Sequence, residues 1–87
     1  MKKFKYKKIM KENTVVHCQS KKQAKQLLKW ADSKGLRWSS NRSYLEDLNY
    51  DMYRGKTCYY LTLGFYCDSH FYKNKNYTIL SFEEVIK

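Results

Sequence analysis

The chain contains no proline and only three glycines among its 87 residues. Gly35, Gly55 and Gly64 stand far apart, so the sequence has no glycine-rich loop of the kind that binds phosphates. It also has no proline-rich linker, no internal repeat and no low-complexity tract. A chain of this length is enough for one domain and too short for two. We therefore expect a single domain over residues 1–87 with a thin core.

Cysteine is also scarce, and long hydrophobic runs are missing. The three cysteines have irregular spacing, and no secretory leader precedes them, because the first residues are basic without an apolar core. No run approaches the length of a membrane span. An odd number of thiols without a leader is typical of reduced cysteines in the cytoplasm. We expect a cytoplasmic chain with no membrane partner.

Acidic side chains are few, with eight Asp and Glu against eighteen Lys and Arg. Glu46, Asp47 and Asp51 share a predicted loop. Glu83 and Glu84 lie at a predicted helix N-terminus, where the helix dipole favours acidic side chains. His17 and Cys18 are neighbours on a predicted strand and would point to opposite faces, which defeats joint zinc ligation with Cys67 and His70. Thiol catalysis lacks a third orienting group. We therefore predict no catalytic residue, no metal, no cofactor and no enzymatic activity.

The net charge of +10 is confined to two segments. Residues 1–12 hold six Lys and one Glu, and residues 20–37 hold five Lys, Arg37 and Asp32, so each segment carries +5. The other residues carry equal numbers of acidic and basic side chains. A localised positive field favours a polyanion or an acidic protein surface as partner. The alternative is a solvated face that keeps a lysine-rich protein soluble.

The strongest helical pattern runs from Ser20 to Gly35. Ser20 and Gln23 form a predicted capping box, and Gly35 follows Lys34 as a left-handed stop. Four apolar residues recur at helical spacing, which predicts one buried stripe: Ala24, Leu27, Leu28 and Ala31. The pattern predicts a helix over about residues 21–34 with a cationic face opposite this stripe.

The strands are expected on both sides of this helix. Apolar and β-branched runs predict strands at residues 13–18, 36–39, 57–63, 65–67 and 77–80, of which the third and fourth form a hairpin. The first two would join through the helix as a right-handed crossover. The resulting fold class is α+β, with one small mixed or antiparallel sheet covered on one face by the long helix.

The remaining segments are assigned from composition. Residues 1–12 form a basic segment that is either a mobile arm or an edge strand, ahead of a sheet-plus-helix core at 13–87. Residues 40–56 predict a long loop with a helical turn, and residues 68–76 predict a polar loop. Ser81 and Glu84 form a second predicted capping box, over a short C-terminal helix.

Three runs, TVVHCQSKKQAKQLLKWADSKGLRWSS, KTCYYLTL and YTILSFEEVI, resemble small accessory proteins of phages and prophages of low-GC Gram-positive bacteria. The resemblance covers about residues 13–87. It implies a phage-type accessory protein, a class that includes anti-CRISPR proteins and other inhibitors of host defence. It supplies no family site residues for this chain.

The leading functional hypothesis is a non-enzymatic inhibitor that docks a basic, tyrosine-rich surface on a host defence protein or nucleoprotein complex. One alternative is a nucleic-acid binder or regulator with little sequence preference, because lysine contacts phosphate more than bases. Another is a sponge for an anionic nucleotide signal, with Arg42, Arg54 and nearby tyrosines lining a pocket. The predicted contact residues are Lys21, Lys22, Lys25, Lys29, Arg37, Arg42, Arg54, Tyr44, Tyr50 and Tyr53.

Overall fold

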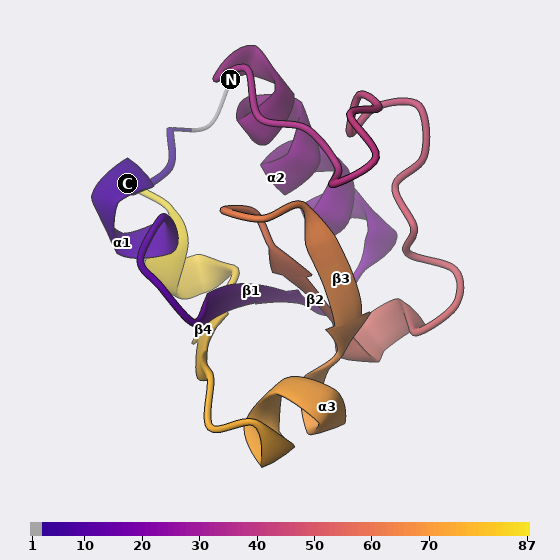
Figure 1. Cartoon of the computed structure of the whole chain (residues 1–87). Coiled ribbons are helices and arrows are strands. Elements are labelled where there is room, and N and C mark those ends of the chain that lie inside the picture. Colours follow the sequence, from indigo (N-terminus) through magenta and orange to yellow (C-terminus); the bar gives the residue numbers. More distant parts are fainter. Residues whose placement is uncertain (1–2) are drawn as a thin grey trace.

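The computed structural model of the chain describes residues 3–87 and has an α+β fold, as predicted (Figure 1). The strands are β1 (Thr14–Cys18), β2 (Thr57–Tyr60), β3 (Phe65–Asp68) and β4 (Thr78–Ser81). The helices are α1 (Tyr6–Ile9), α2 (Lys21–Ser33) and α3 (Ser69–Asn74), with 3₁₀ turns at Arg54–Lys56 and Glu83–Val85.

The four strands form one mixed sheet in the order β3-β2-β1-β4. β1 pairs antiparallel with β2 and parallel with β4, and β2 pairs antiparallel with β3. The predicted hairpin is therefore confirmed, with Tyr60 opposite Phe65. The parallel partner of β1 is β4, so the crossover runs from β1 to the last strand of the chain.

One face of the sheet packs against α2. Strand side chains alternate between faces, and Val16, Cys18 and Tyr59 share a core cluster with the apolar stripe of α2. The helix does not cover this face alone. The same cluster takes in residues from the 36–50 segment and from both ends of the chain: Phe4, Ile9, Trp38, Tyr44, Tyr50, Phe82 and Val85.

The opposite face has a smaller core of its own. Val15, Cys58 and Tyr60 pack with Tyr72 of α3 in a second cluster. Because α3 has only six residues, it covers this face incompletely. In Figure 1, α2 lies behind the sheet and α3 lies below it.

Both predicted capping boxes form hydrogen bonds. The Gln23 backbone N–H donates to Ser20 Oγ at 3.2 Å, and Gln23 Oε1 accepts from the Gln19 N–H at 2.8 Å. At the C-terminal box, the Glu84 N–H donates to Ser81 Oγ at 3.2 Å and Glu84 Oε2 accepts from the Ser81 N–H at 2.8 Å. The element that follows Ser81 is a single 3₁₀ turn, shorter than the predicted helix.

The prediction of a strand at residues 36–39 is wrong. Arg37 makes only an isolated bridge to Ser43, and the Trp38 N–H donates to the Arg42 carbonyl at 3.0 Å. The two positions beside β1 in the sheet are occupied by β2 and β4, so residues 36–39 cannot pair with β1. This segment lies against the tip of the β2–β3 hairpin instead, where the Ser39 N–H donates to the Gly64 carbonyl at 3.0 Å.

The prediction of a polar loop at residues 68–76 is also wrong, because most of it is α3. Asp68 caps this helix through Oδ1, which accepts from the Phe71 N–H at 2.8 Å. Tyr72 then buries its ring against the sheet. The predicted loop at residues 40–56 is confirmed, with its helical turn at Arg54–Lys56.

The prediction of a mobile arm or an edge strand at residues 1–12 is wrong for residues 3–12, and residues 1 and 2 lie outside the described residues. Phe4 makes an isolated bridge to Ile86, and α1 follows it directly. Phe4 is 3% exposed, and its ring lies 5.3 Å from Trp30 and 5.7 Å from Phe82. Burial of this ring outweighs the repulsion among neighbouring lysines and fixes the segment to the core.

Candidate cationic docking surface

The outer face of α2 presents a row of exposed lysines. Lys22, Lys25 and Lys29 recur at helical spacing opposite the buried stripe, so all three point away from the core. We call these three residues the lysine stripe. Over the 13 residues of α2, the stripe follows a helix about 20 Å long.

The protein's own carboxylates leave the lysine stripe unpaired. Within residues 3–87 there are two ion pairs, Lys21–Asp51 at 3.6 Å and Arg42–Glu46 at 3.8 Å. Both are largely exposed, so each contributes little to stability. Lys21 is therefore partly engaged by the protein itself, whereas the stripe keeps its full charge for a partner.

The two cationic segments of the sequence lie side by side in the fold. Trp30 of α2 contacts both Phe4 and Tyr6, with ring centroids 5.3 Å and 6.0 Å away. The Lys5 N–H donates to the Val85 carbonyl, and the Lys87 N–H donates to the Lys3 carbonyl. These contacts bring the N-terminal segment, the end of α2 and the C-terminal residues together.

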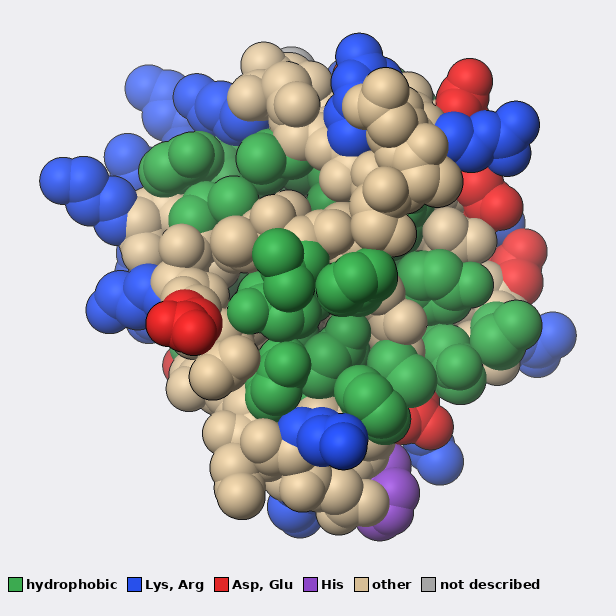
Figure 2. All heavy atoms as spheres, in the orientation of Figure 1, with side chains coloured by type: hydrophobic (Ala, Val, Ile, Leu, Met, Phe, Trp, Pro, Cys, Tyr) green, Lys and Arg blue, Asp and Glu red, His purple; other side chains and the backbone are tan. Residues whose placement is uncertain are grey.

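Two hollows adjoin each other at this junction and share Tyr6 and Lys87. The first, of about 360 Å³, is lined by Lys3, Phe4, Tyr6, Trp30, Ser33, Lys34 and Lys87. The second, of about 440 Å³, is lined by Lys5, Tyr6, Lys7, Lys8 and Lys87. We call the pair the Tyr6 groove. Of the residues that the structure describes, six lysines and no Asp or Glu line it. Several basic side chains project at the left of Figure 2, with others at the top, right and bottom of the view.

The carboxylate of Glu84 lies within the electrostatic reach of two lysines of the groove. The pKa of its carboxyl is lowered, first by the hydrogen bonds from Ser81 and then by the charges of Lys8 and Lys5. Because the carboxylate is already held by the capping box, it offsets only part of the charge of these two lysines.

The lysine stripe and the Tyr6 groove form one surface. Ser33 follows Lys29 by one turn of α2, and Ser33 lines the groove. The stripe therefore leads directly into the groove, and together they make the cationic side of the molecule.

The prediction that Tyr44 and Tyr50 lie at the surface is wrong. Tyr44 is fully buried and its hydroxyl donates to the Leu61 carbonyl at 3.2 Å, while Tyr50 is 7% exposed. Burial raises the pKa of Tyr44 to about 12. Tyr53 stays half-buried, with its ring 6.1 Å from that of Tyr66. The core on this face of the sheet is small, and the large rings of Tyr44 and Tyr50 fill part of it.

The predicted arginines do not form one site. Arg37, Arg42 and Arg54 are all exposed, but Arg42 lines a hollow of about 280 Å³ that Arg54 does not line. The hollow at Arg42 therefore does not bring this arginine together with Arg54, as the nucleotide-pocket prediction required. The hollow at Arg42 is built around Trp38 instead.

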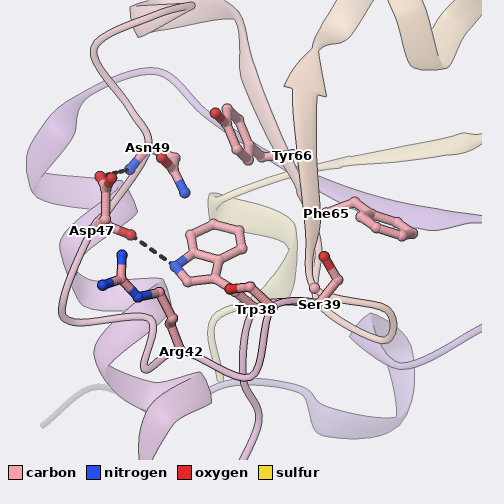
Figure 3. A pocket seen from close by; sticks show the side chains of 9 residues that line it. Trp38, Ser39, Arg42, Asp47, Asn49, Phe65 and Tyr66 are labelled. Atoms are coloured by element: carbon pink, nitrogen blue, oxygen red, sulfur yellow. Dashed lines mark hydrogen bonds between the residues drawn. The ribbon is translucent and has the colours of Figure 1, made fainter.

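Figure 3 shows the arrangement around Trp38. The indole Nε1–H donates to the Asp47 carbonyl at 2.8 Å, and the Tyr66 ring lies 5.6 Å from the indole. Arg42 and Asp47 lie on the same side of the ring, while Phe65 points away. Since a guanidinium and a carboxylate share this hollow, its charge does not favour a multiply charged anion.

An exposed hydrophobic face was not predicted from the sequence. Leu63, Phe65 and Phe71 are 52%, 48% and 44% exposed, although all three are large and apolar. They lie at or near the face that α3 leaves partly open, and hydrophobic side chains cover the centre of Figure 2 over β3 and α3. The alternation of Phe65 with Cys67 on an edge strand is the sequence signal for this face.

The described residues offer no strong nucleophile among the buried thiols. Burial raises the pKa of Cys18, and it raises the pKa of Cys58 to about 12, so both stay protonated at neutral pH. Across residues 3–87, no three His, Cys, Asp or Glu side chains come close enough together to hold a metal ion.

Among the helices of residues 3–87, none is both long and apolar enough to cross a membrane. The sequence matches no protein-family model, and comparisons with curated proteins and with solved structures likewise find no match.

Proposed function

We propose that this chain is a non-enzymatic interaction protein that docks its cationic side on an anionic macromolecular partner. The partner class that suits it best is a nucleoprotein complex, which offers phosphates to lysines over an extended surface. The resemblance to phage accessory proteins adds the proposal that the docked complex is a host defence factor and that docking inhibits it.

The observation that supports this proposal is the unpaired lysine stripe leading into the Tyr6 groove. A charge of +10 alone would be compatible with solubility, but evenly spread lysines would then suffice. Here the lysines of two distant segments are brought together by buried aromatic contacts of Phe4 and Trp30. Bringing like charges together costs free energy, so their placement side by side suits a surface that binds a partner of opposite charge.

The side-chain chemistry favours backbone contacts over base reading. The cationic side is built from lysine, which meets phosphate as a mobile point charge, and it has no arginine fork among its lining residues. Docking should therefore depend strongly on salt and weakly on nucleotide sequence.

Charge reversal of the stripe tests the proposal. The stripe variant replaces Lys22, Lys25 and Lys29 with Glu, and a matched control variant makes the same change in net charge at Lys56, Lys73 and Lys75. Partner capture from a host lysate should be lost in the stripe variant and retained in the control. Both variants should melt close to the wild type, because all six lysines are exposed.

The outcomes separate when capture by the three proteins is compared in the same lysate without nuclease treatment, because the phosphates of a nucleoprotein partner must stay intact. A partner that the wild type and the control variant retain, and the stripe variant loses, supports docking through the cationic side. Equal capture by all three proteins contradicts it. A large fall in the melting temperature of the stripe variant alone would show that these lysines stabilise the fold instead.

A second candidate is direct binding of free nucleic acid as a regulator. The observation that favours it is the half-exposed Tyr6 among six lysines, because an aromatic ring beside cations suits unpaired bases. In that case the wild type and the control variant would capture purified, protein-free nucleic acid, and the stripe variant would not.

A further inference from the structure

We infer that the Tyr6 groove is a binding site for single-stranded nucleic acid, in which Tyr6 stacks on an unpaired base while lysines on either side hold the flanking phosphates. This inference rests on the proposed function and names the chemistry of its partner. No sequence pattern assigns this site, since its lysines come from three separate parts of the chain.

The Tyr6 ring is exposed yet held in place. It is 47% exposed, and it makes a T-shaped contact with Trp30 at 6.0 Å and 65°. Trp30 is itself 4% exposed and packs on the buried Phe4. A ring fixed in this way loses little conformational freedom when a base stacks on it, which favours binding.

The lysines are divided between the two hollows that Tyr6 lines. Lys3 and Lys34 line one hollow, and Lys5, Lys7 and Lys8 line the other. Lys87 lines both. A strand that crosses Tyr6 would therefore have a phosphate near lysines before and after the stacked base. Beyond the groove, the lysine stripe offers further phosphate contacts along α2.

The ring distinguishes between classes of polyanion. An acidic protein surface reaches Tyr6 with a planar group only where one of its aromatic or arginine side chains lies beside its carboxylates. A duplex keeps its bases stacked inside, so Tyr6 would find no free base there. An unpaired strand presents a base next to every phosphate, so it uses both the ring and the cations, and stacking of this kind tolerates any base.

The test compares a short oligothymidylate with an abasic oligonucleotide of the same length and charge, by fluorescence anisotropy at physiological salt. The wild type should bind the oligothymidylate about tenfold more tightly, as expected for one stacked base. Tyr6→Leu should bind both probes equally, at the affinity of the abasic probe. Tyr6→Phe should retain the preference, and Phe71→Leu, at a half-exposed ring elsewhere, should not change it.

Three results would overturn the inference. The wild type could bind both probes equally, Tyr6→Leu could keep the preference, or neither probe could bind. The proposed function fails separately, when the stripe variant captures its partner as well as the wild type does. Loss of capture in the stripe variant without oligonucleotide binding would indicate an acidic protein partner.

Discussion

At the residue scale, glycines with the same backbone conformation have different environments. Gly35 and Gly64 have φ of +80° and +76°, which side-chain-bearing residues rarely adopt. A Cβ on Gly35 would have open space around it, whereas a Cβ on Gly64 would lie 2.5 Å from the Arg37 carbonyl oxygen. Gly64 thus allows the hairpin tip to approach the 36–39 segment, and Gly35 only ends a helix.

Replacing each glycine by alanine should separate these two requirements. We expect Gly35→Ala to lower the free energy of unfolding by about 1 kcal/mol, the cost of a left-handed conformation. Gly64→Ala should cost about 3 kcal/mol or more, because it adds a clash with backbone atoms that must shift. Urea denaturation monitored by circular dichroism measures both. Equal losses would mean that the hairpin tip does not contact the 36–39 segment.

At the element scale, α2 organises the cationic side through its outer face and through Trp30. The outer face presents the lysine stripe, and the Trp30 ring contacts Phe4 and Tyr6 of the N-terminal segment. Without that docking, Lys3 would not be held beside Lys34, and the hollow lined by Lys5, Lys7 and Lys8 would not adjoin it. The groove therefore depends on the aromatic contact between the N-terminal segment and the helix.

Phe4→Ala tests how firmly this segment is fixed. Its buried ring packs on Trp30 and Phe82, so we expect the free energy of unfolding to fall by about 3 kcal/mol. Tyr6→Leu is the control, with a loss below about 1 kcal/mol because nearly half of Tyr6 is exposed. Chemical denaturation of the two variants gives the comparison. A Phe4→Ala protein as stable as Tyr6→Leu would show that the segment is not part of the core.

At the scale of the whole molecule, repulsion among the lysines destabilises the folded state that brings them together. The Cα radius of gyration is 11.4 Å, so lysines on one side lie within one Debye length of one another at low salt, where that length is about 30 Å. Like charges at that range raise the free energy of the compact state. Sodium chloride should therefore stabilise the protein by screening, while it weakens docking on an anionic partner.

We predict that the melting temperature rises by about 3 °C between low-salt buffer and a few hundred millimolar sodium chloride. The stripe variant has a smaller positive charge, so its melting temperature should rise less over the same range. Differential scanning fluorimetry measures both proteins side by side. A melting temperature that stays constant or falls with salt would show that repulsion among these lysines does not affect stability.

Local sequence patterns were sufficient for the elements whose determinants lie close together in the chain. The caps at Ser20 and Ser81 and the apolar stripe of α2 formed as predicted, and so did the β2–β3 hairpin, although β2 ends at Tyr60 instead of Leu63. The six-residue α3 was missed, although its cap at Asp68 is a local signal, because polar residues dominate that segment.

The sequence by itself determined the α+β class, the position of α2 and the confinement of positive charge to two segments. Only the tertiary structure decided that these segments meet, that Tyr44 belongs to the core, and that residues 36–39 are not a strand. The physical reason is that burial and strand pairing depend on contacts between distant residues. Lys3, Lys34 and Lys87 became neighbours because Phe4 is buried against Trp30, and no local pattern specifies that contact.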